Sequence, residues 1–256
     1  MAEKMTTQEL MEAGVHFGHL TRKWNPKMAE YIFMENNGIH IIDLNKTLNA
    51  LEEATSSLKG IVRSGRKIMF VATKKQAKDI IVEEATRLNM PYVTERWLGG
   101  MLTNFATIRK SLKRLSQIDK LTKDEAFANI TKKEKLTLTR ERAKLQKQLG
   151  GISDLNRLPA ALFVIDVKRE HIAVAEAQKL NIPVFAMVDT NSDPSNIDFP
   201  IPSNDDAFKS ISIITRYICK AIEEALMERK KDKEEAGQKK EEEEKRKVDE
   251  VVEETK

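Results

Sequence analysis

The sequence predicts an α/β protein whose doubly wound parallel sheet is interrupted by an antiparallel α-helical, coiled-coil hairpin. Three observations predict this class. Short apolar segments alternate with amphipathic ones along most of the chain, a pattern typical of parallel strands that are covered by helices on both faces. Residues 101–149 contain neither glycine nor proline, although the chain has 10 glycines and 7 prolines. From residue 228 onward, most of the side chains are charged.

These observations divide the 256 residues into three parts. We expect residues 1–100 and 150–227 to form one discontinuous α/β domain. Residues 101–149 should form an inserted helical hairpin between two glycine pairs, which permit the chain to change direction. Residues 228–256 carry 10 basic and 12 acidic side chains, so we expect a disordered or frayed helical tail there.

The amino-terminal part is expected to combine a helix, a loop and a small hairpin. A short helix is predicted over residues 6–13, and an ordered loop over residues 14–28. The turn Asn36-Asn37-Gly38 follows a short apolar segment and predicts a hairpin that leads into a buried strand at residues 39–44. We expect this strand to begin the alternating series of strands and helices.

Nine further elements are predicted to continue the series on either side of the hairpin. The expected strands cover residues 67–73, 92–94, 161–167, 184–188 and 197–201, and the expected helices cover residues 45–62, 74–89, 169–180 and 205 to about 227. Parallel sheets of this kind usually bind ligands beyond the carboxyl ends of their strands.

Each arm of the hairpin is predicted to have an apolar seam and a basic face. At about 100° per residue, the seam of the first arm contains Met101, Phe105, Ile108, Leu112 and Leu115. Thr131 is a predicted N-cap for the second arm, whose seam contains Leu138, Leu145, Leu149 and Ile152. The opposite faces carry Arg109, Lys110, Lys113, Arg114, Arg140, Lys144 and Lys147.

The hairpin concentrates the positive charge of the chain. Residues 108–149 contain 13 basic and 5 acidic side chains, a balance of +8, whereas the whole chain has a net charge of +4. The remainder is therefore acidic, at 4 − 8 = −4. A solvated helix face is the ordinary explanation of a charged run, but a face this basic favours contact with nucleic acid.

Composition also limits the class of protein. The single cysteine, Cys219, cannot form an internal disulfide and suits a reducing compartment. No segment approaches the ~18 apolar residues of a membrane-spanning helix, and the first residues lack the apolar core of a signal peptide. We expect a soluble, cytoplasmic protein without a membrane partner.

Two further segments place cations where phosphates could bind. The predicted loop places the positive charges of Arg22, Lys23 and Lys27 beside the aromatic ring of Trp24. This arrangement suits phosphates and an exposed base. Lys74 and Lys75 follow a strand and begin a helix, whose free N–H groups attract anions. A core tryptophan flanked by solvated lysines is the alternative explanation of the first segment.

An enzyme is the main alternative from another functional class. Asp166 and Asp189 end two successive predicted strands and, with Asp193, could hold Mg²⁺ at the edge of the sheet. However, the sequence contains neither G-x-G-x-x-G nor the P-loop pattern, and no nucleophile or base accompanies the aspartates. Capping and turn formation explain these residues better. We therefore expect no catalytic residues, no cofactor and no small-molecule substrate.

A metal site at His16 and His19 is also not predicted. The two histidines are three residues apart, but His40 and His171 are distant in sequence, and no recognisable ligand set completes a site. Ring stacking or hydrogen bonding within a packed loop is the expected role of His16 and His19.

Several segments together resemble one protein family. They are Gly14-Val15-His16-Phe17-Gly18-His19 with Trp24-Asn25-Pro26-Lys27-Met28, Ala72-Thr73-Lys74-Lys75-Gln76-Ala77, Arg96-Trp97-Leu98-Gly99-Gly100-Met101-Leu102-Thr103-Asn104, residues 159–183, Asp189-Thr190-Asn191, and Ile201-Pro202-Ser203-Asn204-Asp205-Asp206-Ala207. In this order the chain resembles the bacterial small-ribosomal-subunit protein S-two family from about residue 8 to residue 227. Ser192 departs from the family pattern, in which many members have a cysteine.

The resemblance implies a flavodoxin-like α/β domain with a projecting coiled-coil hairpin, bound to ribosomal RNA between the head and the body of the small subunit. It also implies contacts with other small-subunit proteins and a role in recruiting the mRNA-binding ribosomal protein S-one. The expected RNA-binding residues are Arg22, Lys23, Trp24, Lys27, Lys74, Lys75, Arg96, Asn104, Arg109, Lys110, Lys113, Arg114, Arg140, Lys144 and Lys147. An adaptor whose hairpin seam is completed by a partner protein remains a third hypothesis.

Overall fold

The computed structural model describes residues 5–123 and 131–254, and its centre is a parallel sheet of five strands. The strands are β4 (Ile68–Val71), β5 (Tyr92–Val93), β6 (Ala161–Ile165), β7 (Val184–Val188) and β8 (Phe199–Pro202). Their spatial order is β5-β4-β6-β7-β8, and all neighbours pair in parallel. Numbered along the chain, this is the doubly wound order 2-1-3-4-5. The predicted parallel α/β sheet is confirmed.

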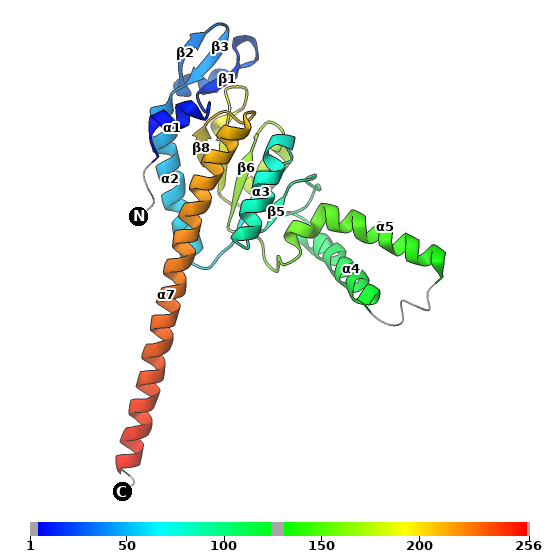
Figure 1. The fold of residues 1–256 in the computed structure, drawn as a ribbon, viewed down its shortest axis with the longest axis vertical. Coiled ribbons are helices and arrows are strands. Elements are labelled where there is room, and N and C mark those ends of the chain that lie inside the picture. The colour runs from blue at the N-terminus through cyan, green and yellow to red at the C-terminus, as the bar shows by residue number, and fades with distance from the viewer. Residues whose placement is uncertain (1–4, 124–130, 255–256) are drawn as a thin grey trace.

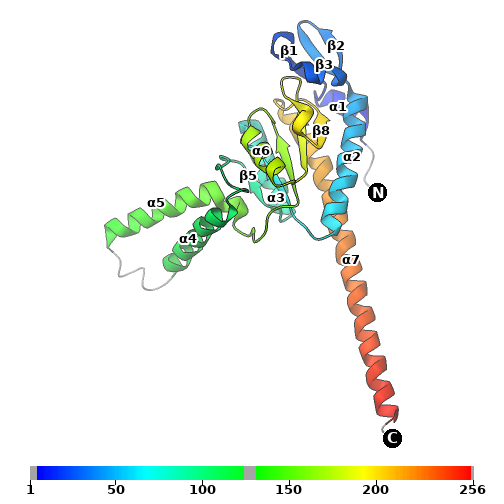
Figure 2. The same ribbon diagram turned by 180° about the vertical axis from the view of Figure 1, so that it is seen from behind.

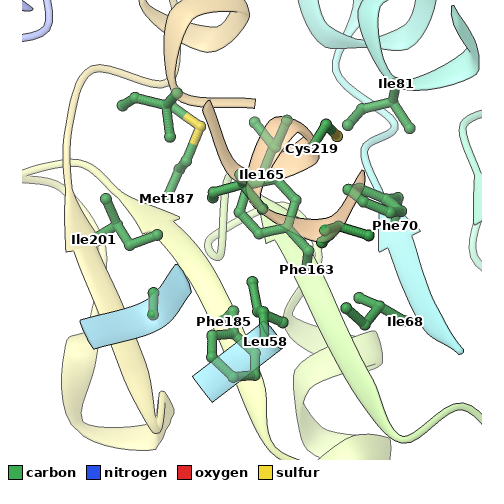
Figure 3. Packing of buried hydrophobic residues seen from close by; sticks show 14 of the residues in the cluster. Leu58, Ile68, Phe70, Ile81, Phe163, Ile165, Phe185, Met187, Ile201 and Cys219 are labelled. Atoms are coloured by element: carbon green, nitrogen blue, oxygen red, sulfur yellow. The ribbon is translucent and has the colours of Figure 1, made fainter. Parts of the chain in front are cut away.

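Helices cover both faces of this sheet. On one face, α2 (Leu44–Arg63), α3 (Lys75–Arg87) and α7 (Phe208–Glu254) enclose the alternate strand residues that include Phe70, Phe163 and Phe185. Figure 3 shows these rings among side chains from the helices, with Cys219 beside them. On the other face, α6 (His171–Lys179) and the segment around Trp97 pack against Met69 and its neighbours. The strands therefore bury both sets of alternating side chains.

The amino-terminal strands form a separate antiparallel sheet, which corrects two predictions. Its order is β1 (Phe17–Leu20), β3 (Ile39–Ile42) and β2 (Ile32–Asn36). The predicted loop at residues 14–28 thus contains a strand, and the predicted strand at residues 39–44 does not begin the parallel series. The reason is the turn at Asn37 and Gly38, whose φ angles of 51° and 73° form a tight hairpin and make β3 antiparallel to β2.

Short helical elements complete the described α/β part. The helix α1 (Thr7–Glu12) begins with a capping box in which Thr6 and Glu9 bond reciprocally. The short 3-10 helices are η1 (Thr21–Lys23), η2 (Pro26–Tyr31), η4 (Gly150–Ile152) and η5 (Pro194–Asn196).

The inserted segment contains two helices that project to one side of the sheet (Figure 2). They are α4 (Phe105–Lys123) and α5 (Lys132–Leu149), and Thr131 caps α5 by accepting a hydrogen bond from the Glu134 N–H. Ion pairs between Arg114 and Glu141, and between Arg142 and Asp119, join the two helices. The segment that joins the two helices, residues 124–130, lies outside the described residues. The coiled-coil character of the pair stays a prediction.

The helix α7 extends far beyond the α/β body (Figure 1). It continues past the predicted end near residue 227 and runs through the charged segment to Glu254. Ion pairs of Glu224 with Lys59 and of Glu228 with Arg63 hold α7 against α2 up to the point where it leaves the body. No helix in the described ranges is long and apolar enough to cross a membrane. The division into one domain, hairpin and tail stays a prediction.

Candidate nucleic-acid interface

The cations predicted on the hairpin are all exposed. They are Arg109, Lys110, Lys113 and Arg114 on α4, and Arg140, Lys144 and Lys147 on α5. Two of the seven have carboxylate partners, because Arg114 binds both oxygens of Glu141 at 3.0 and 3.1 Å and Lys147 lies 3.5 Å from Glu95. Within the described ranges the other five form no ion pair, and we call them the unpaired hairpin cations: Arg109, Lys110, Lys113, Arg140 and Lys144.

The apolar seam of α4 directs the unpaired cations of that helix toward solvent. Ile108, Leu115 and Ile118 are buried at helical spacing, so the positions between them face solvent. Ile108 and Leu115 belong to the predicted seam, whereas Ile118 does not. The seam is more open toward the tip, where Leu121 and Leu136 are exposed.

The carboxylate of Glu176 fixes the segment that leads into the hairpin. Its oxygens accept hydrogen bonds from Trp97 Nε1 at 3.0 Å, from the N–H groups of Gly100, Leu102 and Thr103 at 2.7 to 3.1 Å, and from Thr103 Oγ1 at 3.1 Å. Gly100 has a φ of 84°, which a residue with a side chain rarely adopts. Five donors thus converge on one side chain of α6, and they set the position from which α4 begins.

Glu176 remains charged although it is buried. Burial by itself would raise the pKa of Glu176, but the donors from Trp97, Thr103, Leu102 and Gly100 outweigh it and lower the pKa below its usual value. Glu176 is not among the residues predicted from sequence. The sequence does contain one sign of its role, because Glu176 is an acidic residue on the apolar face of α6, beside Ala173 and Ala177.

The first cation-bearing loop lies over the carboxyl edge of the parallel sheet. Arg22 and Lys23 are exposed in η1, and Lys27 is exposed in η2 with its Nζ atom 2.8 Å from Asp193. The loop is held in place by the Asn25 N–H, which donates to the Thr190 carbonyl at 2.8 Å. The structure therefore brings Arg22, Lys23 and Lys27 to one edge, with Lys27 partly neutralised.

The aromatic rings of this loop have distinct surroundings. Trp24 is 37% exposed, and its ring centroid lies 5.0 Å from that of His40. It is therefore a surface ring rather than the core tryptophan of the alternative explanation. The ring centroid of His16 lies 4.0 Å from that of Phe17, with the two rings tilted at 39° to each other.

Lys74 is buried within a cluster of carboxylates. It is only 8% exposed, and its Nζ atom lies 2.6 Å from both Asp205 and Asp206 and 3.4 Å from Asp166. Burial opposes the charged form, but the carboxylates outweigh it and raise the pKa of Lys74. The ammonium group is therefore committed to three carboxylates and is not free to bind a phosphate.

His19 extends the same cluster. Its Nδ1 atom lies 3.1 Å from Asp189 and its Nε2 atom 3.3 Å from Asp206. The bond to Asp189 raises the pKa of His19, with burial acting in the opposite direction. Burial, together with Asp189 and Asp166, raises the pKa of Asp205 to about 7, although Lys74 opposes this. Of the three aspartates considered for Mg²⁺, Asp166 thus faces Lys74 and Asp189 faces His19, whereas Asp193 faces Lys27. This arrangement serves internal charge pairing.

The remaining predicted residues lie at the start of α3 and on the segment that precedes α4. Lys75 is exposed at the first position of α3, next to the buried Lys74. Arg96 and Asn104 are exposed on the segment that Glu176 holds. The carbonyl of Asn104 accepts a hydrogen bond from the Thr107 N–H at 3.1 Å, so Asn104 also supports the first turn of α4.

Comparison with known proteins gives one consistent result. The family model described as Ribosomal protein S2 matches residues 10–225. The chain is 70% identical over 233 residues to the small ribosomal subunit protein uS2 of Cytophaga hutchinsonii, covering 91% of this chain and 92% of that protein. It is 63% identical over 230 residues to uS2 of Porphyromonas gingivalis, covering 90% and 82%. With uS2 of Flavobacterium johnsoniae it shares 63% identity over 233 residues, covering 91% and 92%.

Proposed function

The chain belongs to the ribosomal protein S2 family, and on this basis we propose that it binds ribosomal RNA through its hairpin and its cation-bearing loops. The protein is a structural, non-enzymatic component of the small ribosomal subunit. We propose here which of its residues hold the protein on the small subunit. RNA is recognised largely through phosphates and the shape of the backbone, and such contacts need fixed cations rather than a catalytic set.

The observation that carries the proposal is the set of five unpaired hairpin cations. An exposed lysine or arginine with a carboxylate partner is already neutralised, whereas an unpaired one displaces counterions when it meets a phosphate. Arg109, Lys110 and Lys113 are consecutive cations on the outward face of α4, with no carboxylate partner in the described structure. They supply the positive potential that attracts a polyanion.

The loops add positioning contacts to this charge. Exposed residues from three segments are available for them, namely Arg22, Lys23, Trp24 and Lys27, then Lys75, then Arg96 and Asn104. The exposed ring of Trp24 supports stacking on an unpaired base or packing against a sugar. We leave Lys74 out of the proposed interface because its ammonium group is bound to Asp166, Asp205 and Asp206.

The test is rebinding of the protein to small subunits that lack it. The wild-type protein should co-sediment with them at moderate salt, and failure to do so would exclude the proposal. Replacing Arg109, Lys110, Lys113 and Arg114 with Ala should weaken binding and reduce the salt slope by up to about 3.6, at about 0.9 per phosphate contact. A control replaces four exposed lysines of the α/β part, Lys168, Lys179, Lys209 and Lys220, and should keep the wild-type slope.

We further propose, from the family resemblance, that the protein helps to recruit ribosomal protein S-one to the small subunit. Subunits reconstituted with and without this protein should then differ in their S-one content. Equal S-one content in the two preparations would exclude this role and would leave the RNA-binding proposal untouched.

A further inference from the structure

A hollow of about 730 Å³ lies between the start of the hairpin and the turn that precedes β4. Three segments line it: the turn with Arg66 and Lys67, the first turns of α4 with Phe105 and Arg109, and the segment with Arg157 and Leu158 that leads to β6. We call this hollow the root groove. Of these residues, only Arg109 was among those predicted from sequence to contact RNA.

The root groove is strongly basic. Among the described residues, its lining includes Arg66, Lys67, Arg109 and Arg157 but only one carboxylate, that of Asp154. Arg66, Arg109 and Arg157 are exposed, and none of the four cations forms an ion pair within the described residues. Such a concentration of one sign of charge around a concave surface focuses positive potential and attracts an anionic ligand.

The walls of the root groove are held in place by the fold. The Ala160 N–H donates to the Lys67 carbonyl at 2.8 Å, and Ile68 pairs with Ala161 immediately beyond, so two of the three segments run side by side. The guanidinium group of Arg229 packs over Gly65 at the end of the groove, where α7 passes. The cations therefore project from a fixed framework, which reduces the entropy lost on binding.

The floor of the root groove is apolar. Leu155 is buried, Phe105 is half-buried and Leu158 is 40% exposed. A purely phosphate-binding surface would not require an apolar floor, whereas an unpaired base stacks on apolar side chains and on the planes of guanidinium groups. An acidic peptide would satisfy the cations but would leave this floor without a planar group to cover it.

We propose that the root groove binds one unpaired nucleotide of ribosomal RNA together with its flanking phosphates. The inference rests on the proposed RNA-binding function and assigns to it a further contact, where the start of the hairpin meets the α/β part. The base lies over Leu158 and Phe105, and Arg66, Arg109 and Arg157 meet the phosphates or stack on the base. The volume of the groove suits a ligand of nucleotide size.

The first test combines Arg66→Ala with Arg157→Ala and leaves Arg109 and the rest of the hairpin unchanged. In rebinding to small subunits that lack this protein, the double variant should reduce the salt slope by about 1.4, at about 0.7 per phosphate contact on a single strand. The matched control, Lys179→Ala with Lys209→Ala, removes the same charge from exposed sites outside the groove. Equal slopes for the two double variants would overturn the inference.

The second test identifies the ligand directly. Leu158 is replaced by the photo-crosslinking residue p-benzoylphenylalanine, and the variant is assembled into small subunits and irradiated. A crosslink to ribosomal RNA, mapped to a nucleotide outside a duplex, is the expected result. A crosslink to a ribosomal protein, a crosslink to a paired nucleotide or the absence of any crosslink would each overturn the inference.

The third test addresses the planar group. Arg157→Lys keeps the charge but removes the guanidinium plane, and we expect binding about as weak as that of Arg157→Ala at high salt, where phosphate attraction is screened. Full binding by Arg157→Lys at high salt would show that charge alone acts and would overturn the stacked-base assignment.

If the hairpin variant loses affinity while the groove variant does not, the inference fails and the proposed function stands. If the wild-type protein does not bind subunits, both fail.

Discussion

The carboxyl edge of the sheet and the hairpin both concentrate charge, but they use it in opposite ways. At the carboxyl edge, Lys74 faces Asp166, Asp205 and Asp206, and His19 bridges Asp189 and Asp206. On the hairpin, the unpaired cations have no carboxylate partner among the described residues and face solvent. The first set of charges is satisfied within the protein, and the second is available to another molecule.

The difference is sharpest at two neighbouring residues. Lys74 and Lys75 are adjacent lysines at the start of the same helix, yet Lys74 is buried among carboxylates and Lys75 is exposed. Removal of one partner from a buried ion pair is strongly destabilising, because it leaves the other charge buried without compensation. An exposed lysine contributes little to stability and is free to contact phosphate. The two positions therefore separate stability from binding.

The largest expected effect is that of Lys74→Ala on stability. The change leaves Asp166, Asp205 and Asp206 close together without their shared cation, so the free energy of unfolding should fall by about 3 kcal/mol. Urea unfolding monitored by circular dichroism measures it. Lys75→Ala is the matched control and should change stability by less than about 0.5 kcal/mol. Similar stabilities for the two variants would remove the distinction between the two lysines.

Glu176→Ala should have the next largest effect on the free energy of unfolding. Glu176 lies where the α/β part meets the hairpin. It leaves the N–H groups of Gly100, Leu102 and Thr103 and the ring N–H of Trp97 without their acceptor. Unsatisfied donors cost about 1–3 kcal/mol each when buried, and partial access of water should bring the total to about 2 kcal/mol. Hydrogen exchange should show loss of protection at residues 100, 102 and 103.

The control for Glu176→Ala is Glu9→Ala on α1, which also removes a hydrogen-bonded carboxylate from a helix. It should not change exchange at residues 100–103. In addition, Glu176→Ala should weaken rebinding to small subunits, because α4 no longer leaves the sheet at a fixed angle. Unchanged exchange at these three amides would show that Glu176 does not hold the junction.

The parallel sheet could be predicted from sequence because its strands are continuous apolar runs separated by amphipathic helices. The hairpin of the amino-terminal sheet could be predicted from its turn, but β1 was missed because its four residues are half-buried or exposed and form no continuous apolar run. The partners of Lys74 could not be predicted, since Asp205 lies 131 positions away and only the fold brings them together. The same holds for Glu176, which is 76 positions from Gly100.

The hairpin cations were predictable for the opposite reason. Their spacing along one helix determines which face they occupy, and no distant partner is needed to place them. Arg109, Lys110 and Lys113 could therefore be assigned to an exposed face before the structure was known. Arg66 and Arg157 could not, because the root groove forms only when β4 and β6 pair.

A smaller change in folding stability is expected when the pH is varied. The hydrogen bond to Asp189 raises the pKa of His19, so the folded protein binds this proton more tightly than the unfolded chain. The stabilisation is fully present below the unfolded pKa of about 6.5 and is lost as pH rises through the folded value. Wild-type stability should therefore fall, relative to that of His19→Gln, as pH rises from about 6.5 through the raised folded pKa. A constant difference between the two proteins over this range would contradict the prediction. Asp205, whose raised pKa is about 7, acts in the same direction but is present in both proteins.

The smallest expected difference lies within the hairpin itself, between Arg109 and Arg114. Both are exposed on α4, but Arg114 is bound to both oxygens of Glu141, whereas Arg109 has no ion-pair partner in the described ranges. A phosphate that meets Arg114 must compete with Glu141. Arg109→Ala should therefore reduce the salt slope of subunit binding by about 0.9, and Arg114→Ala by less. Glu141→Gln releases Arg114 and should steepen the slope of the otherwise unchanged protein. Equal slopes for Arg109→Ala and Arg114→Ala, together with no effect of Glu141→Gln, would show that ion pairing on the free hairpin does not determine which cations bind RNA.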